Sequence, residues 1–359
     1  MISAGSVVMA AVDRFARTPF LSWQTPIERQ PRLSEKLGIE LVVKRDDLTG
    51  LAFGGNKVRQ LEFYFGKAVA AGADTILITG AVQSNYVRVA AACAARLGMA
   101  CHIQLEERVA GVDEIYRASG NVLLNELLGA TLHSYPVGED EEGADRQLGE
   151  IADELAAQGR RPFVVPLSAN HPPLGALGYI KCAAELLDQG VAFDHVVLGS
   201  GSGQTHAGLL FGLRALGWKG DVVGICVRRA ARLQKPRIEG LCRRTAELLG
   251  IDNPVRQGDV EVHDDVLAPG YGVLNEAVSA AVRDCARLDG LLVEPVYTGR
   301  TMAGLFARVR DGRLPQRSKV MFLHTGGLPA LFAYATELRR TVVSQSTAGC
   351  PSSGPLIQI

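Results

Sequence analysis

Short apolar runs alternate with longer helical patterns along most of the chain. Runs rich in apolar residues predict strands at 40–45, 74–80, 101–105, 131–135, 163–166, 195–198, 222–227, 291–295 and 319–324. Helical patterns are predicted at 57–69, 87–97, 120–128, 146–158, 178–187 and 206–216. This alternation is typical of a parallel sheet with helices on its faces. We therefore predict a doubly wound α/β chain with two lobes.

Both ends of the chain break the alternation. Pro19, Pro26 and Pro31 punctuate residues 1–35, so this segment is predicted to be a loosely structured lead-in. The tail, residues 344–359, begins with a stretch rich in Ser, Gly and Pro and is expected to be loose. No internal repeat or low-complexity segment is visible.

The composition is that of a globular protein without a strongly charged partner. The chain has 359 residues, more than one typical domain, and 47% of them are hydrophobic, which is enough for a sizeable core. Its formal net charge is zero, which argues against nucleic acid or an anionic membrane as the main partner. No apolar run approaches membrane-spanning length, and the N-terminal segment lacks the basic region of a signal peptide.

The cysteines show no framework. There are seven, and no pair has CxxC or zinc-site spacing: Cys93, Cys101, Cys182, Cys226, Cys242, Cys285 and Cys350. An odd number of scattered cysteines is typical of reduced thiols in the cytoplasm. We expect a cytoplasmic protein without a metal site.

One lysine stands at the start of a predicted helix. Lys57 follows Gly54-Gly55-Asn56, and an apolar stripe follows it at Val58, Leu61, Phe65 and Val69. The positive end of the helix dipole disfavours a cation there and can lower the pKa of the lysine towards that of a usable amine. The alternative is a solvated surface lysine.

A glycine-rich run joins a predicted strand to a predicted helix. Its sequence is Gly199-Ser200-Gly201-Ser202-Gly203-Gln204-Thr205. Such a turn aims N–H groups at an anion, and the helix N-terminus adds its dipole. The run lacks the Gly-Lys-Ser/Thr of a Walker A loop and the third glycine of a dinucleotide fingerprint. What remains is a cradle for a single phosphate, or a tight turn without a ligand.

A helix-start lysine and a monophosphate cradle together suggest pyridoxal 5′-phosphate, because the lysine forms the imine and the loop holds the phosphate. Ser84 and Asn85 lie at another helix N-terminus, suited to a substrate carboxylate, although either can be a simple N-cap. Tyr271 and Tyr297 lie in loops, where ordinary loop aromatics are the alternative.

Seven motifs occur in a fixed order along the chain. They are Lys-Arg-Asp-Asp at 44–47, Gly-Gly-Asn-Lys at 54–57, Gln-Ser-Asn at 83–85, Ser-Gly-Asn-Val-Leu-Leu at 119–124, the glycine-rich run at 199–205, Pro-Val-Tyr-Thr-Gly at 295–299 and His-Thr-Gly-Gly at 324–327. In this order they resemble the 1-aminocyclopropane-1-carboxylate deaminase and D-cysteine desulfhydrase family of pyridoxal-phosphate enzymes. The similarity covers residues 19–337.

The resemblance implies the tryptophan-synthase-β fold, also called fold type II. This is an α/β architecture of two domains, each an open, twisted, mostly parallel sheet flanked by helices. We expect the large, cofactor-binding domain at 1–60 and 175–343 and the small domain at 61–174. The family further suggests a homodimer.

The resemblance also implies a role for each matching residue. Lys57 would be the Schiff-base lysine and would move the α-proton, while residues 199–205 would hold the phosphate. Asn85 would contact the phenolic oxygen of the cofactor, and Ser84 the substrate carboxylate. Tyr297 would stack on the pyridine ring, and Tyr271 would face the reacting carbon or the leaving group.

Two positions separate the activities within this family. Ring-opening deaminases carry Glu after the stacking tyrosine and Leu between His and Gly-Gly, whereas this chain has Thr298 and Thr325, the desulfhydrase pattern. A carboxylate beside the pyridine nitrogen keeps it protonated and strengthens the electron sink. A threonine supports a weaker sink, adequate for a good β-leaving group. We expect Thr298 and Thr325 to contact the cofactor and β-elimination to be favoured.

Two stretches depart from the family pattern. Tyr86 stands where desulfhydrases usually have His and deaminases Gln. Residues 166–172 replace the usual Gly-Gly-Ser-Asn, and their His171-Pro172 is similar to the deaminases. Tyr86 and Asn170 are expected to contact the substrate, so the departures concern the identity of the substrate and leave the cofactor unaffected.

These observations predict a pyridoxal-phosphate-dependent carbon–sulfur lyase. The first hypothesis for its substrate is D-cysteine, converted to pyruvate, sulfide and ammonia, with cysteate or 3-chloroalanine as alternatives. Ring-opening deamination of 1-aminocyclopropane-1-carboxylate is the second hypothesis, supported by His171-Pro172 and opposed by both threonines. A third is a phosphate- or nucleotide-binding regulatory protein, which leaves Lys57 and the two tyrosines unexplained.

Overall fold

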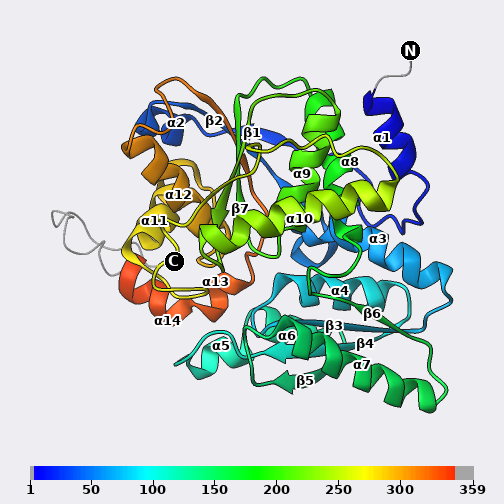
Figure 1. Cartoon of the computed structure of the whole chain (residues 1–359). Helices are drawn as coiled ribbons and strands as arrows, with labels where there is room; N and C mark the ends of the chain where they lie inside the picture. The colour runs from blue at the N-terminus through cyan, green and yellow to red at the C-terminus, as the bar shows by residue number, and fades with distance from the viewer. Residues whose placement is uncertain (1–3, 344–359) are drawn as a thin grey trace.

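Two mostly parallel sheets with helices on their faces form the described part of the chain (Figure 1). The computed structural model describes residues 4–343. The larger sheet has the order β1-β2-β10-β7-β8-β9, with β1 antiparallel to β2, and the smaller sheet has the parallel order β5-β4-β3-β6. The strands are β1 (Ile27–Arg29), β2 (Glu40–Lys44), β3 (Thr75–Ala81), β4 (Ala100–Glu106), β5 (Thr131–Tyr135), β6 (Pro162–Val165), β7 (His195–Ser200), β8 (Asp221–Cys226), β9 (Glu261–His263) and β10 (Lys319–Leu323). The predicted α/β class is confirmed.

Helices connect most of the strands and cover both sheets. They are α1 (Ala4–Val12), α2 (Pro31–Leu37), α3 (Lys57–Ala70), α4 (Asn85–Arg96), α5 (Glu114–Ala118), α6 (Asn121–Leu127), α7 (Glu141–Ala157), α8 (Leu174–Asp188), α9 (Gln204–Ala215), α10 (Ala231–Leu249), α11 (Glu276–Asp289), α12 (Thr298–Arg310), α13 (Ala330–Ala333) and α14 (Ala335–Leu338). Short 3₁₀ turns occupy Asp46–Leu48 and Leu51–Phe53, and a π-turn Arg339–Val343. We call the larger sheet with its helices the large lobe and the smaller sheet with its helices the small lobe.

The strand order creates a switch point in each sheet. In the large lobe β8 and β9 extend to one side of β7 and β10 lies on the other; in the small lobe β3 lies between β4 and β6. Ligands of open α/β sheets bind outside the carboxyl ends of strands at such points. The carboxyl end of β7 leads into the glycine-rich run, and that of β3 leads towards Ser84. Both sheets therefore present a switch point where a site is expected.

Close helix packing fixes the start of α3 relative to α9. Gly178 of α8 lies against the backbone of Arg59 in α3, and Gly208 of α9 lies against the backbone of Ala176 in α8. Neither position has room for a Cβ atom. The three helices therefore approach closely, which holds the N-terminus of α3 near that of α9.

Four sequence predictions need correction. The predicted lead-in contains α1, β1 and the start of α2. Pro31 does not prevent α2, because it occupies the first turn of the helix, where proline is favoured. Residues 291–295 form a loop rather than a strand. The helix predicted at 146–158 starts at Glu141, because Asp140 caps it by accepting from the Gly143 N–H at 2.8 Å. Val69 is 47% exposed and does not belong to the buried stripe of α3.

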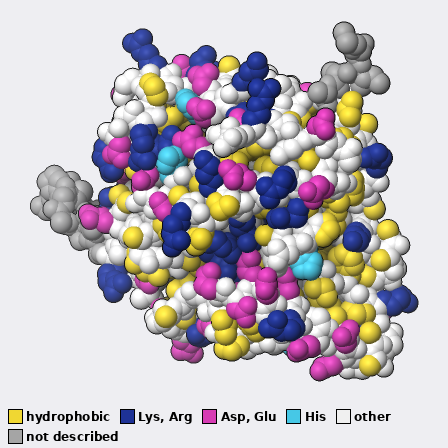
Figure 2. Space-filling view, in the orientation of Figure 1, with side chains coloured by type: hydrophobic (Ala, Val, Ile, Leu, Met, Phe, Trp, Pro, Cys, Tyr) yellow, Lys and Arg dark blue, Asp and Glu magenta, His cyan; other side chains and the backbone are white. Residues whose placement is uncertain are grey.

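The structure places the strands of the smaller sheet between residues 75 and 165 and those of the larger sheet outside that range. The domain boundaries at 60/61 and 174/175 stay a prediction, and the predicted loose tail at 344–359 lies outside the described residues. No helix within residues 4–343 is long and apolar enough to cross a membrane. Figure 2 shows basic and acidic side chains interspersed over one face, in keeping with the zero net charge.

The cysteines of the described part of the chain are buried and free: Cys93, Cys101, Cys182, Cys226, Cys242 and Cys285. Cys350 lies outside that part. Burial raises the pKa of these thiols, for example to about 12 for Cys101, which keeps them protonated and unreactive at neutral pH.

Candidate active site

Lys57 is the first residue of α3 and lines a cavity where the loops of both lobes meet. The cavity encloses about 810 Å³, its open mouth included. Twelve of the predicted site residues line it: Lys57, Ser84, Asn85, Tyr86, Gly199, Gly201, Ser202, Gly203, Thr205, Tyr271, Tyr297 and Thr325. Ser200, Gln204, Thr298 and Asn170 do not. Segments far apart in the sequence thus converge on one lysine.

The Lys57 ammonium is half-buried, and no carboxylate within residues 4–343 pairs with it. Its Nζ donates to Gln60 Oε1 at 3.2 Å and lies 5.1 Å from the centre of the Tyr86 ring. Burial lowers the pKa of Lys57 to about 8. The predicted direction is right, and desolvation is its cause.

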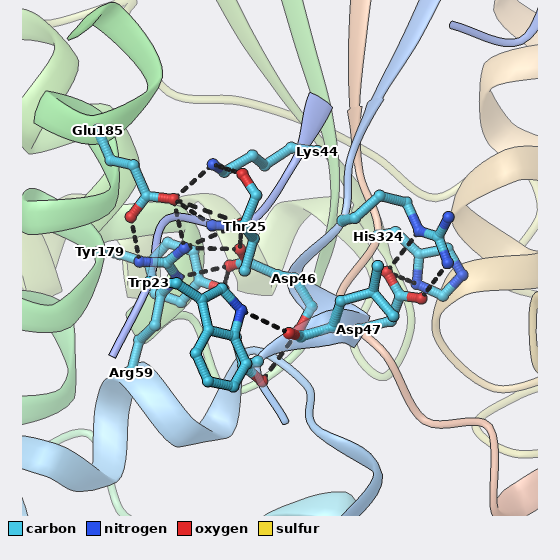
Figure 3. A network of polar contacts seen from close by, with 12 residues as sticks. Trp23, Thr25, Lys44, Asp46, Asp47, Arg59, Tyr179, Glu185 and His324 are labelled. Carbon is cyan, nitrogen blue, oxygen red and sulfur yellow. Dashed lines mark hydrogen bonds and ion pairs between the residues drawn. The ribbon is translucent and has the colours of Figure 1, made fainter. Parts of the chain in front are cut away.

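A buried polar network holds the segment that leads to Lys57 (Figure 3). Asp46 accepts from Thr25 Oγ1 at 2.8 Å, from Arg59 Nη2 at 2.9 Å and from the Tyr179 hydroxyl at 2.6 Å. Glu185 of α8 pairs with Arg59 at 2.8 Å and with Lys44 at 2.5 Å. The Lys-Arg-Asp-Asp motif is therefore structural, because it anchors the chain before α3 to α3 and α8.

The glycine-rich run borders the cavity with the backbone of its glycines and with Ser202 and Thr205. Gly203 has φ +105°, and no side chain caps the N-terminus of α9. Thr205 Oγ1 accepts from Asn56 Nδ2 at 2.8 Å and from Gln60 Nε2 at 2.7 Å, which leaves its hydroxyl proton to donate to a ligand. These groups fit an anion held at the start of α9.

The side chains of Ser200 and Gln204 point away from this cradle. Ser200 Oγ lies 3.1 Å from His206 Nδ1, and Gln204 Nε2 donates to the Tyr64 hydroxyl at 3.0 Å. Burial lowers the pKa of His206 to about 4, so its ring is neutral. Ser200 and Gln204 can therefore contribute only their backbone groups to a ligand site, while their side chains support the loop.

The α4 N-terminus forms the opposite wall of the cavity. Ser84 is the N-cap and accepts from the Tyr86 N–H at 3.2 Å, so its capping role is real. Asn85 Oδ1 accepts from Asn121 Nδ2 at 3.0 Å and from Arg88 Nη2 at 3.3 Å. The Asn85 Nδ2 is left as a donor oriented by these contacts.

Tyr271 and Tyr297 form a hydroxyl pair at 2.8 Å. Their ring centres lie 6.0 Å apart with an interplanar angle of 75°. Burial raises the pKa of both phenols, so both are neutral at physiological pH. A Cβ added to Gly201 would lie 3.6 Å from Tyr297 Cε1, so the Tyr297 ring borders the glycine-rich run.

Thr298 lies behind the cavity wall, which the sequence did not indicate. Its hydroxyl donates to Glu294 Oε1 at 3.2 Å and accepts from the Glu294 N–H at 2.9 Å. The Glu294 carboxylate also accepts from the N–H groups of Val296, Tyr297 and Thr298 at 2.7–2.8 Å. Burial raises the pKa of Glu294 to about 7. The Glu294 carboxylate is therefore hydrogen-bonded to the residue at position 298, where the ring-opening deaminases are expected to carry a carboxylate.

Asn170 departs from its predicted place. It is exposed, and its Nδ2 donates to Glu142 Oε1 at 3.1 Å, while Leu167 of the same stretch lines the cavity. Tyr86 does line the cavity, and its buried hydroxyl lies beside that of Tyr64. Thr325 also lines the cavity, and its carbonyl accepts from the Asn56 N–H at 3.0 Å.

Two arginines that line the cavity were missed. Arg108 follows β4 and Arg228 follows β8. The signal was available, since polar residues just after parallel strands lie at the edge where ligands bind. The sequence did not show which of the many arginines face inward.

Comparisons with known proteins agree with this geometry. A family model described as "Pyridoxal-phosphate dependent enzyme" matches residues 20–326. The chain is 41% identical to D-cysteine desulfhydrase of Yersinia pestis (strain Pestoides F) over 330 residues, which cover 91% of this chain and 98% of the relative. It is 42% identical to D-cysteine desulfhydrase of Salmonella typhimurium over 326 residues, covering 90% and 97%. A solved structure described as an ACC deaminase homologue matches with a TM-score of 0.83 and 35% identity, covering 93% and 98%.

Proposed function

The chain belongs to the family of pyridoxal-phosphate-dependent enzymes, and we propose that it eliminates sulfide from D-cysteine, giving pyruvate and ammonia. The observation that carries this proposal is Lys57, an uncompensated cation of lowered pKa that faces the glycine-rich run. The identity to D-cysteine desulfhydrases over most of the chain supports the choice of substrate.

The residues around the cavity fit pyridoxal phosphate. The α9 N-terminus and the Thr205 hydroxyl would hold its phosphate, and Asn85 Nδ2 would donate to its phenolic oxygen. Tyr297 borders the same space and would cover one face of the ring. When bound, the cofactor supplies the electron sink that makes the α-proton of an amino acid removable.

The residues of this chain have distinct tasks in elimination. A neutral Lys57 amine accepts the α-proton, and the low pKa makes that form accessible near neutral pH. Ser84 and the neighbouring amides of α4 orient the substrate carboxylate. The neutral Tyr271 hydroxyl, which contacts that of Tyr297, would hydrogen-bond a departing β-substituent.

Glu294 modifies the expected role of Thr298. Thr298 lies behind the cavity wall and its hydroxyl donates to the Glu294 carboxylate, so Thr298 would act on the pyridine nitrogen through this pair rather than by direct contact. The pair would support a moderate electron sink, consistent with a good leaving group. We further propose the domain ranges given above, a homodimer and a cytoplasmic location, which the family resemblance and the reduced cysteines favour.

The test measures sulfide and pyruvate released from D-cysteine by the cofactor-loaded protein. The parent should release both in equal amounts, and Lys57→Ala should lose at least roughly 10³-fold in rate. Lys67→Ala, on the exposed face of α3, is the matched control and should keep the parent rate. Release of 2-oxobutanoate from 1-aminocyclopropane-1-carboxylate without sulfide from D-cysteine would instead assign the deaminase activity.

A further inference from the structure

A buried arginine near the cavity has no carboxylate partner among the described residues. Arg88 of α4 is fully buried, and within residues 4–343 its guanidinium bonds only to carbonyl and amide oxygens. Taking a cation out of water without an opposite charge costs free energy. Arg59 of α3 is buried too, but it pairs with Asp46 and Glu185. Stability of the fold alone therefore does not explain Arg88.

The Arg88 guanidinium donates to the turn that leads to Lys57. Its Nη1 donates to the Gly54 carbonyl at 3.1 Å and also to the Ala52 carbonyl. This turn comes after β2 of the large lobe, whereas α4 lies on the side of the small lobe that is turned towards the large lobe (Figure 1). Arg88 thus reaches from the small lobe to the backbone before the lysine.

The turn has a backbone that needs such support. Ala52 and Phe53 have φ of +45° and +66°, and the two glycines that follow also have positive φ. Residues with a Cβ atom rarely adopt positive φ, and such conformations persist only where the surroundings enforce them. Since Lys57 starts α3 directly after this segment and Asn56, its placement depends on contacts such as those of Arg88.

The same guanidinium orients Asn85. Its Nη2 donates to Asn85 Oδ1 at 3.3 Å, and its Nε donates to Asn121 Oδ1 at 3.1 Å. Asn121 Nδ2 in turn donates to Asn85 Oδ1 at 3.0 Å. A guanidinium cannot accept a hydrogen bond, so Asn85 must turn its oxygen to Arg88, which leaves its Nδ2 as the donor for a ligand in the cavity. The charge of Arg88 also polarises the Asn85 amide and makes Nδ2 a stronger donor.

We propose that Arg88 is a positioning residue for pyridoxal phosphate: it holds the turn before Lys57 and the Asn85 amide at a fixed spacing, so that both groups reach the same cofactor ring. This inference rests on the proposed roles of Lys57 and Asn85. Without Arg88 the turn can relax and the Asn85 amide can rotate, so the lysine and the amide no longer match the cofactor together.

Cofactor binding tests this role without any turnover. The cofactor-loaded protein is dialysed against decreasing concentrations of pyridoxal phosphate, and the visible absorbance gives the bound fraction and the Kd. Arg88→Met keeps most of the volume but no donor and should raise this Kd roughly 10- to 100-fold. Arg88→Lys keeps the charge with fewer donors and should recover part of the loss. Arg96→Met, which changes an exposed arginine in the last turn of the same helix, is the control and should keep the parent Kd.

A double-mutant cycle separates positioning from a general loss of structure. If Arg88 acts through the Asn85 amide, adding Arg88→Met to Asn85→Ala should raise the Kd at least about 3-fold less than Arg88→Met does in the parent. Losses that simply multiply would mean that the two residues act independently and would overturn the inference. Urea unfolding checks that each variant is folded, and the cycle is measured with Arg88→Lys if Arg88→Met does not unfold cooperatively.

The proposed function and this inference can fail separately. A Kd that Arg88→Met leaves unchanged overturns the inference, while release of sulfide from D-cysteine by the parent would still support the proposed function. A non-additive loss of cofactor binding in a protein that releases no sulfide from D-cysteine keeps the inference and refutes the proposed function. A parent protein that binds no pyridoxal phosphate refutes both.

Discussion

The chemistry of Lys57 depends on its burial. An amine of pKa about 8 is neutral in a substantial fraction of molecules near neutral pH, whereas an ordinary lysine is almost wholly charged. Since the neutral amine is the nucleophile that takes up the cofactor aldehyde, uptake by the cofactor-free protein should accelerate with pH up to about 8 and level off above it. The rate is read from the visible absorbance of the bound cofactor at each pH.

The same cofactor reacting with N-acetyl-lysine corrects for titration of the aldehyde itself, and Lys67→Ala serves as the protein control. A corrected rate that keeps rising up to the ordinary lysine pKa would show that Lys57 is solvated like a surface amine.

The residues that sequence motifs identified are those whose role is local. Lys57, Ser84 and Asn85 sit at helix starts that the sequence marks directly, and the cavity contains all three. Glu294 and Arg108 were not identified, because their significance arises from partners in the fold. In the sequence, Glu294 is an acidic residue within an apolar run. Only the structure shows that the N–H groups of Val296 and Thr298 donate to its carboxylate and so allow its burial.

At the scale of elements, the Asp46–Leu48 turn fixes the approach to α3. Burial alone would raise the pKa of Asp46, but Arg59 outweighs it and the pKa is lowered. Asp46→Asn leaves the Arg59 cation without its buried partner and should cost roughly 3–5 kcal/mol in the free energy of unfolding at pH 7. Urea unfolding measures this loss.

The stabilising contribution of the Asp46 carboxylate should change with pH in a defined direction. A carboxyl with a lowered folded pKa stabilises above its unfolded pKa, 3.8 here, and that contribution is lost as the pH falls through the folded value. The difference between the parent and Asp46→Asn should therefore narrow in acid. Asp188→Asn, at an exposed position at the end of α8, is the control. A pH-independent difference would mean that shape rather than charge is lost.

A second element-scale device is the loop that carries Tyr271. The buried Arg300 of α12 donates to the carbonyls of Val266, Leu267, Gly270 and Val273, at 2.5–3.2 Å. Arg300→Met leaves these carbonyls unpaired, so the loop should exchange amide hydrogens faster and kcat/KM should fall roughly 10- to 100-fold. Hydrogen exchange over residues 266–273 and steady-state kinetics check this.

Arg300→Lys keeps a cation with fewer donors and should restore part of the protection. Arg310→Met, on the exposed end of the same helix, is the control. Unchanged exchange in Arg300→Met would show that the loop is held by Tyr271 and its neighbours instead.

Elements were predicted well where the pattern alone decides them. Within the described residues, eight of the ten strands and six of the fourteen helices were predicted within about five residues, because apolar runs and helix signals are local. The helices α1, α2, α5 and α10 to α14 were not predicted. The strand prediction at 291–295 was wrong for two reasons. Pro295 has no N–H to donate to a neighbouring strand, and the N–H groups of Val296 and Tyr297 donate to the Glu294 carboxylate instead. The prediction of a loosely structured lead-in was wrong because prolines can begin or flank helices and strands, as Pro31 begins α2.

At the scale of the whole molecule, the cavity depends on how the lobes meet. Glu141, the first residue of α7 in the small lobe, accepts from Arg228 at 2.7 Å and from Arg237 at 3.0 Å and also pairs with Arg229, all in the large lobe. Arg228 and Arg229 lie two and three residues after the end of β8, and Arg237 lies in α10. One carboxylate thus bridges the lobes beside the cavity, and nothing in the local sequence pattern marks it.

Glu141→Gln keeps the shape of this bridge and removes its charge. Burial alone would raise the pKa of Glu141, but the three arginines outweigh it and the pKa is lowered. The contribution of the bridge is therefore present above the unfolded pKa of 4.5 and is lost as the pH falls through the folded value. At pH 7 the variant should lose about 1–3 kcal/mol in the free energy of unfolding.

Kinetics separate this bridge from the catalytic residues. Because Glu141 does not line the cavity, its loss should raise KM several-fold through weaker closure of the lobes and leave kcat nearly unchanged. Glu142→Gln, the exposed neighbour on α7, should change neither constant. A fall in kcat with an unchanged KM in Glu141→Gln would contradict this expectation. It would show that Glu141 affects the reacting groups and that other contacts between the lobes determine substrate binding.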